Sequence, residues 1–133
     1  LLKNLKRTYT LGLLTDYAHQ SQMNKVKALG IEEIFDAIVY TDEINAEKPS
    51  TKGFLVLKKQ LRCRNSEIVY IGDNETKDFL GAKKAGFLTI KFVNKNGYYY
   101  HQKTMSTMHR AHDEVKTLKK VPQAILRFEK GVM

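Results

Sequence analysis

Four short apolar runs, separated by longer segments with helical spacing of apolar residues, constrain the fold of this chain more than any other feature. The runs are Tyr9 to Thr15, Phe35 to Tyr40, Glu67 to Ile71 and Leu88 to Val93. Apolar runs of this length predict buried strands, and the periodic segments between them predict helices. Parallel strands need a crossover connection, usually a helix. The alternation therefore predicts an α/β fold, a three-layer, doubly wound, Rossmann-like parallel sheet.

The three predicted helices each carry apolar residues at helical spacing, and two of them end at a glycine. The apolar positions are Met23, Val26 and Leu29 in the first helix, Phe54, Leu57 and Leu61 in the second, and Phe79, Leu80 and Ala82 in the third. Gly30 and Gly86 are predicted to end the first and third helices, the second begins at Pro49 and Ser50, and the third runs from Thr76 to Ala85. Leu1, Leu2 and Leu5 predict the last turns of a further amphipathic helix.

The pattern after Val93 is weaker and leaves alternatives open. Asn96 and Gly97 predict a tight turn, after which Tyr98 to Tyr100 either extend a strand or cover a sheet edge. Stacking of these tyrosines on a ligand is a less favoured alternative. We expect a loop over 101–112, a short edge strand from Glu114 to Leu118 and a terminal helix from Pro122 to Lys130. With 133 residues, of which 42% are hydrophobic, we expect a single domain, with βα units in 1–93 and the loop, edge strand and helix in 94–133.

The formal net charge of +9 indicates an anionic partner: nucleic acid, an acidic membrane or a phosphorylated small molecule. We disfavour nucleic acid, because the lysines lie in pairs along helix faces with no interleaved aromatic residues. No apolar stretch approaches the roughly 18 residues of a membrane span, and the start does not resemble a secretory signal, so we expect a cytoplasmic protein. Cys63 is the one cysteine, which excludes an internal disulfide. The four histidines, His19, His101, His109 and His112, have no metal-ligand spacing and are interpreted as surface or loop residues.

Polar residues follow three of the predicted strands, where parallel strands deliver their loops to one edge of a sheet. They are Thr15 and Asp16, then Lys48, and finally Asp73 and Asp78. A hydroxyl, an ammonium group and carboxylates at one edge favour a site for phosphate and a divalent cation. Mg²⁺ prefers oxygen ligands, so Asp73 is the candidate ligand and Asp78 a water-mediated or supporting partner. Each residue alone has a simpler explanation as a helix cap, a turn residue or a solvated lysine.

Three segments in this order resemble the second, third and fourth motifs of the haloacid dehalogenase superfamily. They are LGLLTDY, AEKPSTKGF and VYIGDNETKDFLGAKKAGF, and the resemblance covers residues 1 to 93. It implies a phosphoryl-transfer hydrolase in which Thr15 binds phosphate with its neighbour Asp16, Lys48 stabilises charge, and Asp73 and Asp78 hold Mg²⁺. It also implies that substrate choice depends on a cap domain inserted after the family's first strand.

The chain departs from that family at its nucleophile, the first Asp of an Asp-x-Asp pair that ends the family's first strand. The remaining aspartates do not form such a pair after an apolar run; they are Asp16, Asp36, Asp42 and Asp113. We therefore expect the C-terminal portion of a Mg²⁺-dependent phosphohydrolase, inactive by itself, from which upstream sequence has been removed or left out. The alternatives are a catalytically degenerate binding or structural domain of a larger protein, and a basic nucleic-acid binder.

In the family that missing strand is central in the sheet. Its absence predicts either direct pairing of Tyr9 to Thr15 with Glu67 to Ile71, or a strand supplied by another segment or subunit, because unpaired backbone groups inside a sheet are costly. A homo-oligomer is one way to supply it.

Overall fold

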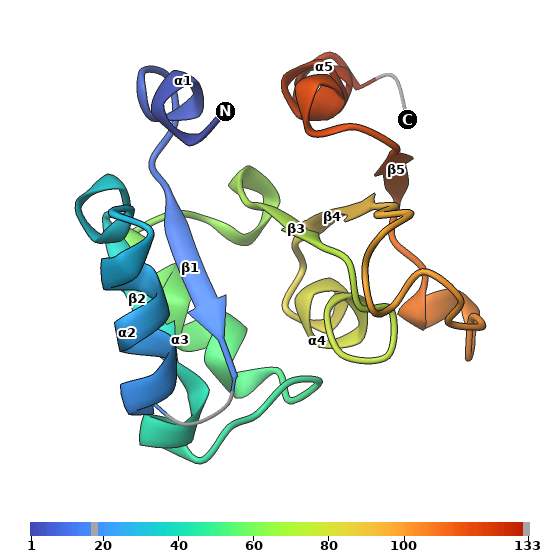
Figure 1. Ribbon diagram of the computed structural model, residues 1–133. Coiled ribbons are helices and arrows are strands. Elements are labelled where there is room, and N and C mark those ends of the chain that lie inside the picture. Colours follow the sequence, from blue (N-terminus) through green and yellow to red (C-terminus); the bar gives the residue numbers. More distant parts are fainter. Residues whose placement is uncertain (17–18, 132–133) are drawn as a thin grey trace. The chain divides into compact units, whose positions relative to one another are not determined.

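Five short parallel strands organise the part of the chain that the computed structural model describes, residues 1–16 and 19–131. They form a two-stranded sheet, β1–β2, and a three-stranded sheet in the order β3–β4–β5. The sheets belong to two units, Leu1–Cys63 and Arg64–Met133, and each unit is described by itself (Figure 1). Parallel strands connected through helices confirm the predicted α/β fold class.

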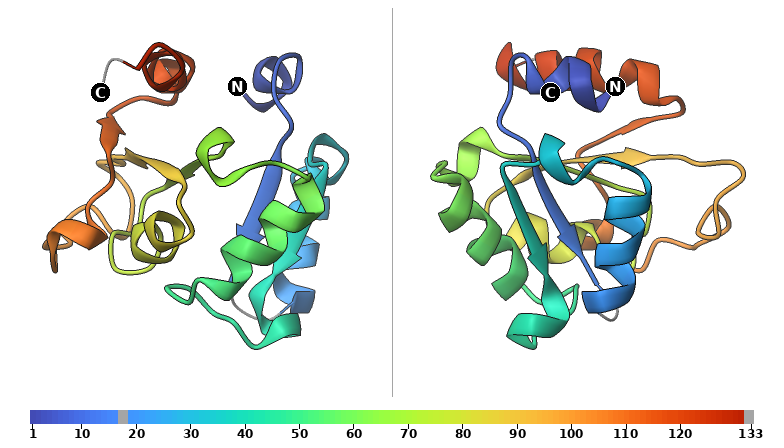
Figure 2. Two further views of the ribbon diagram at one scale, coloured as in Figure 1. Left: turned by 180° about the vertical axis from the view of Figure 1, so that it is seen from behind. Right: turned by 60° about the vertical axis from the view of Figure 1, so that its left-hand side comes forward.

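The first unit contains three helices, two strands and two short 3-10 helices. In chain order they are α1 (Leu2–Lys6), β1 (Gly12–Thr15), α2 (His19–Ala28), a 3-10 helix (Glu32–Ile34), β2 (Ala37–Tyr40), a 3-10 helix (Thr41–Ile44) and α3 (Lys52–Leu61). The right-hand view of Figure 2 shows α2 and α3 on opposite sides of the β1–β2 pair. This placement is the doubly wound arrangement within one βαβα segment.

Helix α3 packs against both strands of this unit. Its Phe54 has no exposed surface and Leu57 is buried, which confirms two of the three apolar positions predicted for this helix. A Cβ at Gly53 would lie 3.1 Å from Leu14 Cδ1 and 3.3 Å from Thr41 Cγ2, so glycine lets the helix approach the strands closely. The core of the first unit therefore lies between α3 and the β1–β2 pair.

One apolar position predicted for α2 is wrong. Leu29 is 70% exposed because the helix ends at Ala28, whereas Val26 is buried as predicted. Gly30 follows with φ +66°, the left-handed conformation expected of a residue that ends a helix.

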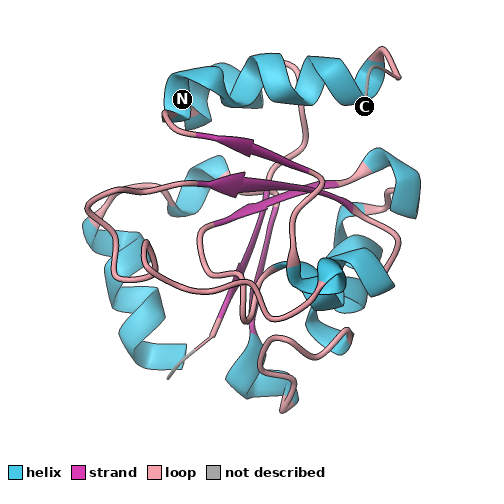
Figure 3. Cartoon of the chain, turned by 90° about the vertical axis from the view of Figure 1, so that its right-hand side faces the viewer, coloured by secondary structure: helices cyan, strands magenta, loops and turns pink. Residues whose placement is uncertain are grey.

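The second unit contains three strands, two helices and three short 3-10 helices. In chain order they are a 3-10 helix (Asn65–Glu67), β3 (Val69–Gly72), α4 (Phe79–Lys84), β4 (Leu88–Phe92), a 3-10 helix (Thr107–His109), β5 (Asp113–Val115), a 3-10 helix (Leu118–Lys120) and α5 (Val121–Glu129). Helix α4 packs on β3 and β4, and α5 packs on β5. Figure 3 shows the long loop between β4 and β5, which the sequence predicted, in pink.

Three predictions for this unit need correction. Helix α4 begins at Phe79 rather than Thr76, because the amides of Asp73 and Asn74 donate to the Asp78 side chain and close a turn before the helix. The edge strand is Asp113–Val115, earlier and shorter than the predicted Glu114 to Leu118. Tyr98 to Tyr100 do not extend a strand; they follow a turn in which the Gly97 amide donates to the Asn94 carbonyl.

Among the described residues the hydrogen-bonded strand pairs are β1–β2 in the first unit and β3–β4 and β4–β5 in the second. Both ways of closing the sheet, direct pairing of Tyr9 to Thr15 with Glu67 to Ile71 and a strand supplied by another segment or subunit, stay predictions. None of the helices within the described ranges has the length and hydropathy to cross a membrane.

Side chains also join β4 to the start of β5. The Nδ1 atom of His112 accepts the backbone amide of Thr89 at 3.0 Å and lies 2.8 Å from its hydroxyl, and that hydroxyl accepts the His112 amide at 3.0 Å. A backbone amide can only donate, so this geometry requires an unprotonated Nδ1. Partial burial lowers the pKa of His112 below its usual value of 6.5, and the positive charge of Lys83 lowers it further.

Replacing Phe54 by alanine is expected to lower the free energy of unfolding by about 3–5 kcal/mol, the usual cost of removing a buried phenylalanine. Urea unfolding followed by circular dichroism measures it. The neighbouring Leu55 is 45% exposed, so Leu55→Ala is the matched control and should change stability far less. Equal losses in the two variants would contradict the packing described for α3.

Acid is expected to destabilise the second unit through His112. Because the folded-state pKa lies below the unfolded-state value, the unfolded chain binds the proton more readily, and stability falls as the pH drops from about 6.5 toward the folded-state pKa. Thermal unfolding between pH 7.5 and 5 measures this loss. His112→Gln should flatten the profile, whereas His101→Gln, in the exposed part of the loop, should leave it unchanged. A His112→Gln profile as steep as that of the unsubstituted chain would contradict the assignment.

Candidate functional site

Asp16, directly after β1, bonds to two other segments of the first unit. Its side chain is buried, and its Oδ1 atom accepts the Thr41 hydroxyl at 2.7 Å and the Lys48 backbone amide at 3.0 Å. Thr41 follows β2 and Lys48 precedes α3, so one carboxylate joins the ends of both strands to the loop before the helix. Hydrogen bonds of this kind offset the cost of burying a charge.

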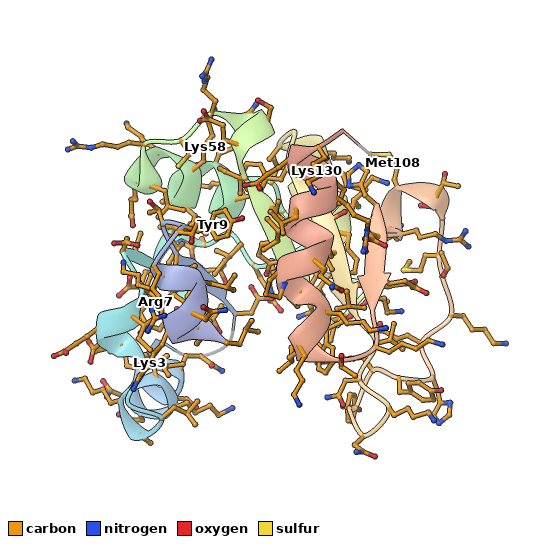
Figure 4. The ribbon with its side chains drawn as sticks, turned by 90° about the horizontal axis from the view of Figure 1, so that it is seen from above. Lys3, Arg7, Tyr9, Lys58, Met108 and Lys130 are labelled. Atoms are coloured by element: carbon orange, nitrogen blue, oxygen red, sulfur yellow. The ribbon has the colours of Figure 1, made fainter. Side chains whose placement is uncertain are left out.

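The other two predicted residues of this unit lie on the same segments. Thr15 is the last residue of β1, paired with Tyr40 of β2, and its side chain is half-buried. Lys48 is also half-buried and is joined to Pro49 by a cis peptide bond. The bonds of Asp16 therefore bring Thr15, Asp16 and the Lys48 backbone to one end of the β1–β2 pair, as predicted for the carboxyl edge. Figure 4 shows Tyr9, just before β1, close to α1.

Asp73 and Asp78 lie on one turn that follows β3 in the second unit. Asp78 is buried, and its Oδ2 atom accepts the amides of Asp73 at 3.1 Å and Asn74 at 2.8 Å. A Cβ at Gly72 would lie only 2.9 Å from the Asp78 Cβ and closer still to its carboxylate, so the turn has no room for a larger residue there. Asp78 thus fixes the backbone from which the half-buried Asp73 side chain extends.

A largely buried ion pair between Glu75 and Lys91 stabilises this turn. The Glu75 carboxylate accepts Lys91 Nζ at 2.8 Å through Oε1 and the Thr104 hydroxyl at 2.8 Å through Oε2. The Glu75 and Lys91 side chains are only 5% and 13% exposed. Burial opposes ionisation of Glu75, but the bonds from Lys91 and Thr104 and the charges of Lys91 and Arg110 outweigh it, so the pKa of Glu75 is lower than usual.

Sequence reasoning missed these supporting residues, although one signal was present. Lys91 stands inside the apolar run Leu88 to Val93, and a lysine in a buried strand needs a partner of opposite charge. Its partner Glu75 lies within the segment VYIGDNETKDFLGAKKAGF, which resembles the fourth family motif. Thr104 and Gln102 gave no signal, because they lie in an aperiodic loop whose path the sequence does not specify.

A pocket lies beside Asp73 in the second unit. It is lined by Asp73, Lys91, Phe92, Val93, Asn94, Tyr99 and Tyr100. Tyr99 and Tyr100 therefore border a pocket, the position that the less favoured alternative for these tyrosines, stacking on a ligand, would require. Tyr98 is 94% exposed and stacks edge to face with Tyr99.

The Asp73 turn carries carboxylates of the kind that can bind Mg²⁺, but not a full set of ligands. No group of three or more His, Cys, Asp or Glu side chains within them is arranged to hold a metal ion. The bond between the Asp73 amide and Asp78 does place two carboxyl-bearing residues on one tight turn, and carboxylate oxygens are the ligands that Mg²⁺ prefers. The turn fits Mg²⁺ as a partial site that needs further oxygen ligands.

Comparison with known proteins identifies the family. A family model described as haloacid dehalogenase-like hydrolase matches residues 1–93, well over half of the chain. The chain belongs to the haloacid dehalogenase-like hydrolase family. The matched range is the one over which the three motif segments occur.

Curated relatives and solved structures agree with this family. The chain is 31% identical over 115 residues to a glyceraldehyde 3-phosphate phosphatase of Methanocaldococcus jannaschii, covering 83% of this chain and 50% of that protein. It is 32% identical over 97 residues to human N-acylneuraminate-9-phosphatase, covering 73% and 39%. The crystal structure of a HAD phosphatase from Thermococcus onnurineus matches with a TM-score of 0.78 and 31% identity, covering 93% of this chain and 54% of that one. The chain thus spans half or less of the length of these curated relatives.

Asp16→Ala is expected to destabilise the first unit by about 1–3 kcal/mol for each buried donor left without an acceptor. Chemical denaturation measures the loss. Asp16→Asn keeps an acceptor oxygen at the same position and should lose less, and Asp42→Ala on the exposed 3-10 helix is the control. An Asp16→Ala variant as stable as the Asp42→Ala variant would contradict the role of this carboxylate.

Proposed function

We propose that this chain is the C-terminal portion of a Mg²⁺-dependent phosphohydrolase that acts on a phosphorylated small molecule. The observation that carries the proposal is that, in a member of this hydrolase family, a buried aspartate holds each of the two segments that carry the candidate site residues. Asp16, directly after β1, fixes the Lys48 loop between β2 and α3, and Asp78 fixes the Asp73 turn beyond β3. Both segments follow the carboxyl ends of parallel strands, where such folds bind their ligands.

Each predicted residue has a role in this proposal. Thr15 donates its hydroxyl to a phosphoryl oxygen and Lys48 offsets the charge that develops during transfer, with Asp16 holding the segments that carry them. Asp73 contributes an oxygen ligand to Mg²⁺, and Asp78 holds the turn and completes the chain's share of the site. Bound Mg²⁺ would neutralise phosphate charge and orient the phosphoryl group.

Other parts of the parent protein supply what these residues lack. An aspartate pair on an additional strand would provide the nucleophile, the general acid and further metal ligands. The strand pairings support this, since β1 and β3 each have one partner strand within their own unit among the described residues and a parallel strand can add to either. That strand comes from upstream sequence of the same polypeptide, or from another subunit. The names of the relatives, which are phosphatases longer than this chain, support the same view.

The described basic side chains do not favour the nucleic-acid alternative. Lys3 lies on α1, Lys58 on α3 and Lys130 just after α5, which are separate helices of two units (Figure 4). A phosphorylated small molecule would suit the positive net charge of the chain. A cytoplasmic location would suit such a substrate.

Asp73→Asn is expected to reduce Mg²⁺-dependent hydrolysis of p-nitrophenyl phosphate by at least about 100-fold in the chain extended through its upstream reading frame, because a metal ligand contributes several kcal/mol to the transition state. Asp42→Asn, at an exposed position, is the control. The 133-residue chain alone should show no turnover. Full activity of the extended Asp73→Asn variant would refute the metal assignment, and an extended chain without any phosphatase activity would favour a catalytically degenerate binding domain.

A further inference from the structure

The loop 94–112, between β4 and β5, contacts the Asp73 turn through the side-chain amide of Gln102. Gln102 Oε1 accepts the Glu75 amide at 2.9 Å, and Gln102 Nε2 donates to Asn74 Oδ1 at 2.7 Å and to Thr76 Oγ1 at 3.2 Å. One side chain therefore bonds to three consecutive residues that directly follow Asp73.

The orientation of the Gln102 amide is determined by its partners. The Glu75 backbone amide can only donate, so the atom facing it must be the carbonyl oxygen of Gln102. The amide nitrogen then faces Asn74 Oδ1, which also accepts the Thr76 hydroxyl at 2.7 Å and the Thr76 amide at 3.2 Å. Each donor in this network thus meets an acceptor, and the network admits one arrangement.

A second contact from the same loop reaches the same turn. Thr104 donates to Glu75 Oε2, while Lys91 of β4 binds Oε1 of that buried carboxylate. The turn is consequently held on one side by Asp78, which accepts the Asp73 and Asn74 amides, and on the other by Gln102 and Thr104. The loop also borders Asp73 directly, since Tyr99 and Tyr100 line the pocket beside it.

We propose that Gln102 is a positioning residue of the metal site, which holds the turn after β3 in the conformation that directs Asp73 to the cation. This inference rests on the proposed function, because it assigns a purpose to a network around the proposed ligand. Residues that orient a metal ligand without touching the metal contribute 10- to 100-fold to affinity in well-studied sites. Gln102 acts through Asn74, Glu75 and Thr76, and it is not itself a ligand.

The test uses the chain extended through its upstream reading frame, which would carry the further metal ligands, with Mn²⁺ alone as the probe. Gln102→Met keeps the length of the side chain and removes its donor and acceptor, and Gln102→Ala, which cannot overpack the loop, is measured in parallel. The matched control is Gln123→Met, on the exposed surface of α5. Amide hydrogen exchange without metal reports the order of the turn, paramagnetic broadening of the Asp73 amide reports Mn²⁺ affinity, and thermal unfolding reports the stability of the fold.

In both Gln102 variants the Glu75 amide is expected to exchange at least about 10-fold faster. Mn²⁺ affinity is expected to fall at least about 10-fold, and the unfolding temperature should not change. The control should match the unsubstituted chain. Unchanged exchange at Glu75 would overturn the proposal. Faster exchange with unchanged Mn²⁺ affinity would also overturn it, because Gln102 would then order the turn without affecting metal binding. Absence of Mn²⁺ broadening in the unsubstituted chain would instead contradict the metal assignment of the proposed function, and this inference with it.

Discussion

Buried carboxylates that accept backbone amides hold together both segments on which the proposed chemistry depends. Removing a carboxylate from water is costly, and hydrogen bonds from N–H groups are the ordinary way to offset that cost. Asp16 receives the Lys48 amide in the first unit, and Asp78 receives the Asp73 and Asn74 amides in the second. In each case the bond links the end of a strand to the loop that follows or faces it. The positions of the candidate catalytic groups therefore follow from the hydrogen bonds that the backbone N–H groups of these loops make to buried carboxylates.

These bonds separate two roles that the sequence had placed together. Asp16 was grouped with Thr15 as a phosphate-binding residue, but a carboxylate and a phosphate repel each other. Its bonds to Thr41 and Lys48 support a role in holding the loop, with Thr15 and Lys48 as the groups able to meet an anion. Asp73 and Asp78 also have different roles. Asp78 directs Oδ2 into the turn, and Asp73 extends from the backbone that Asp78 fixes.

The sequence predicted the fold class and the segments that carry the candidate residues, because apolar periodicity and glycine positions are local signals. Gly30 adopts the left-handed conformation expected of it, and Phe54 is buried as its spacing required. The shorter α4 and the contacts of Gln102 could not be predicted in the same way. The start of α4 depends on a local bond from the Asn74 amide to the Asp78 side chain, which competes with the helix, and the contacts of Gln102 join residues 27 or 28 positions apart in sequence. His112 was missed for the same reason, since its partner Thr89 lies on a different strand.

The edges of the two sheets bear on how the proposed active form would be completed. The family resemblance implies one more central strand, and β1 and β3 each have one partner strand within their own unit among the described residues. Parallel edge strands such as β1 and β3 expose backbone donors and acceptors that a further strand can satisfy. In the family that strand also ends at the catalytic aspartates. The hydrogen bonds that would complete the sheet would therefore deliver the nucleophile and the remaining metal ligands in the same step, so that assembly of the fold and assembly of the site are one event.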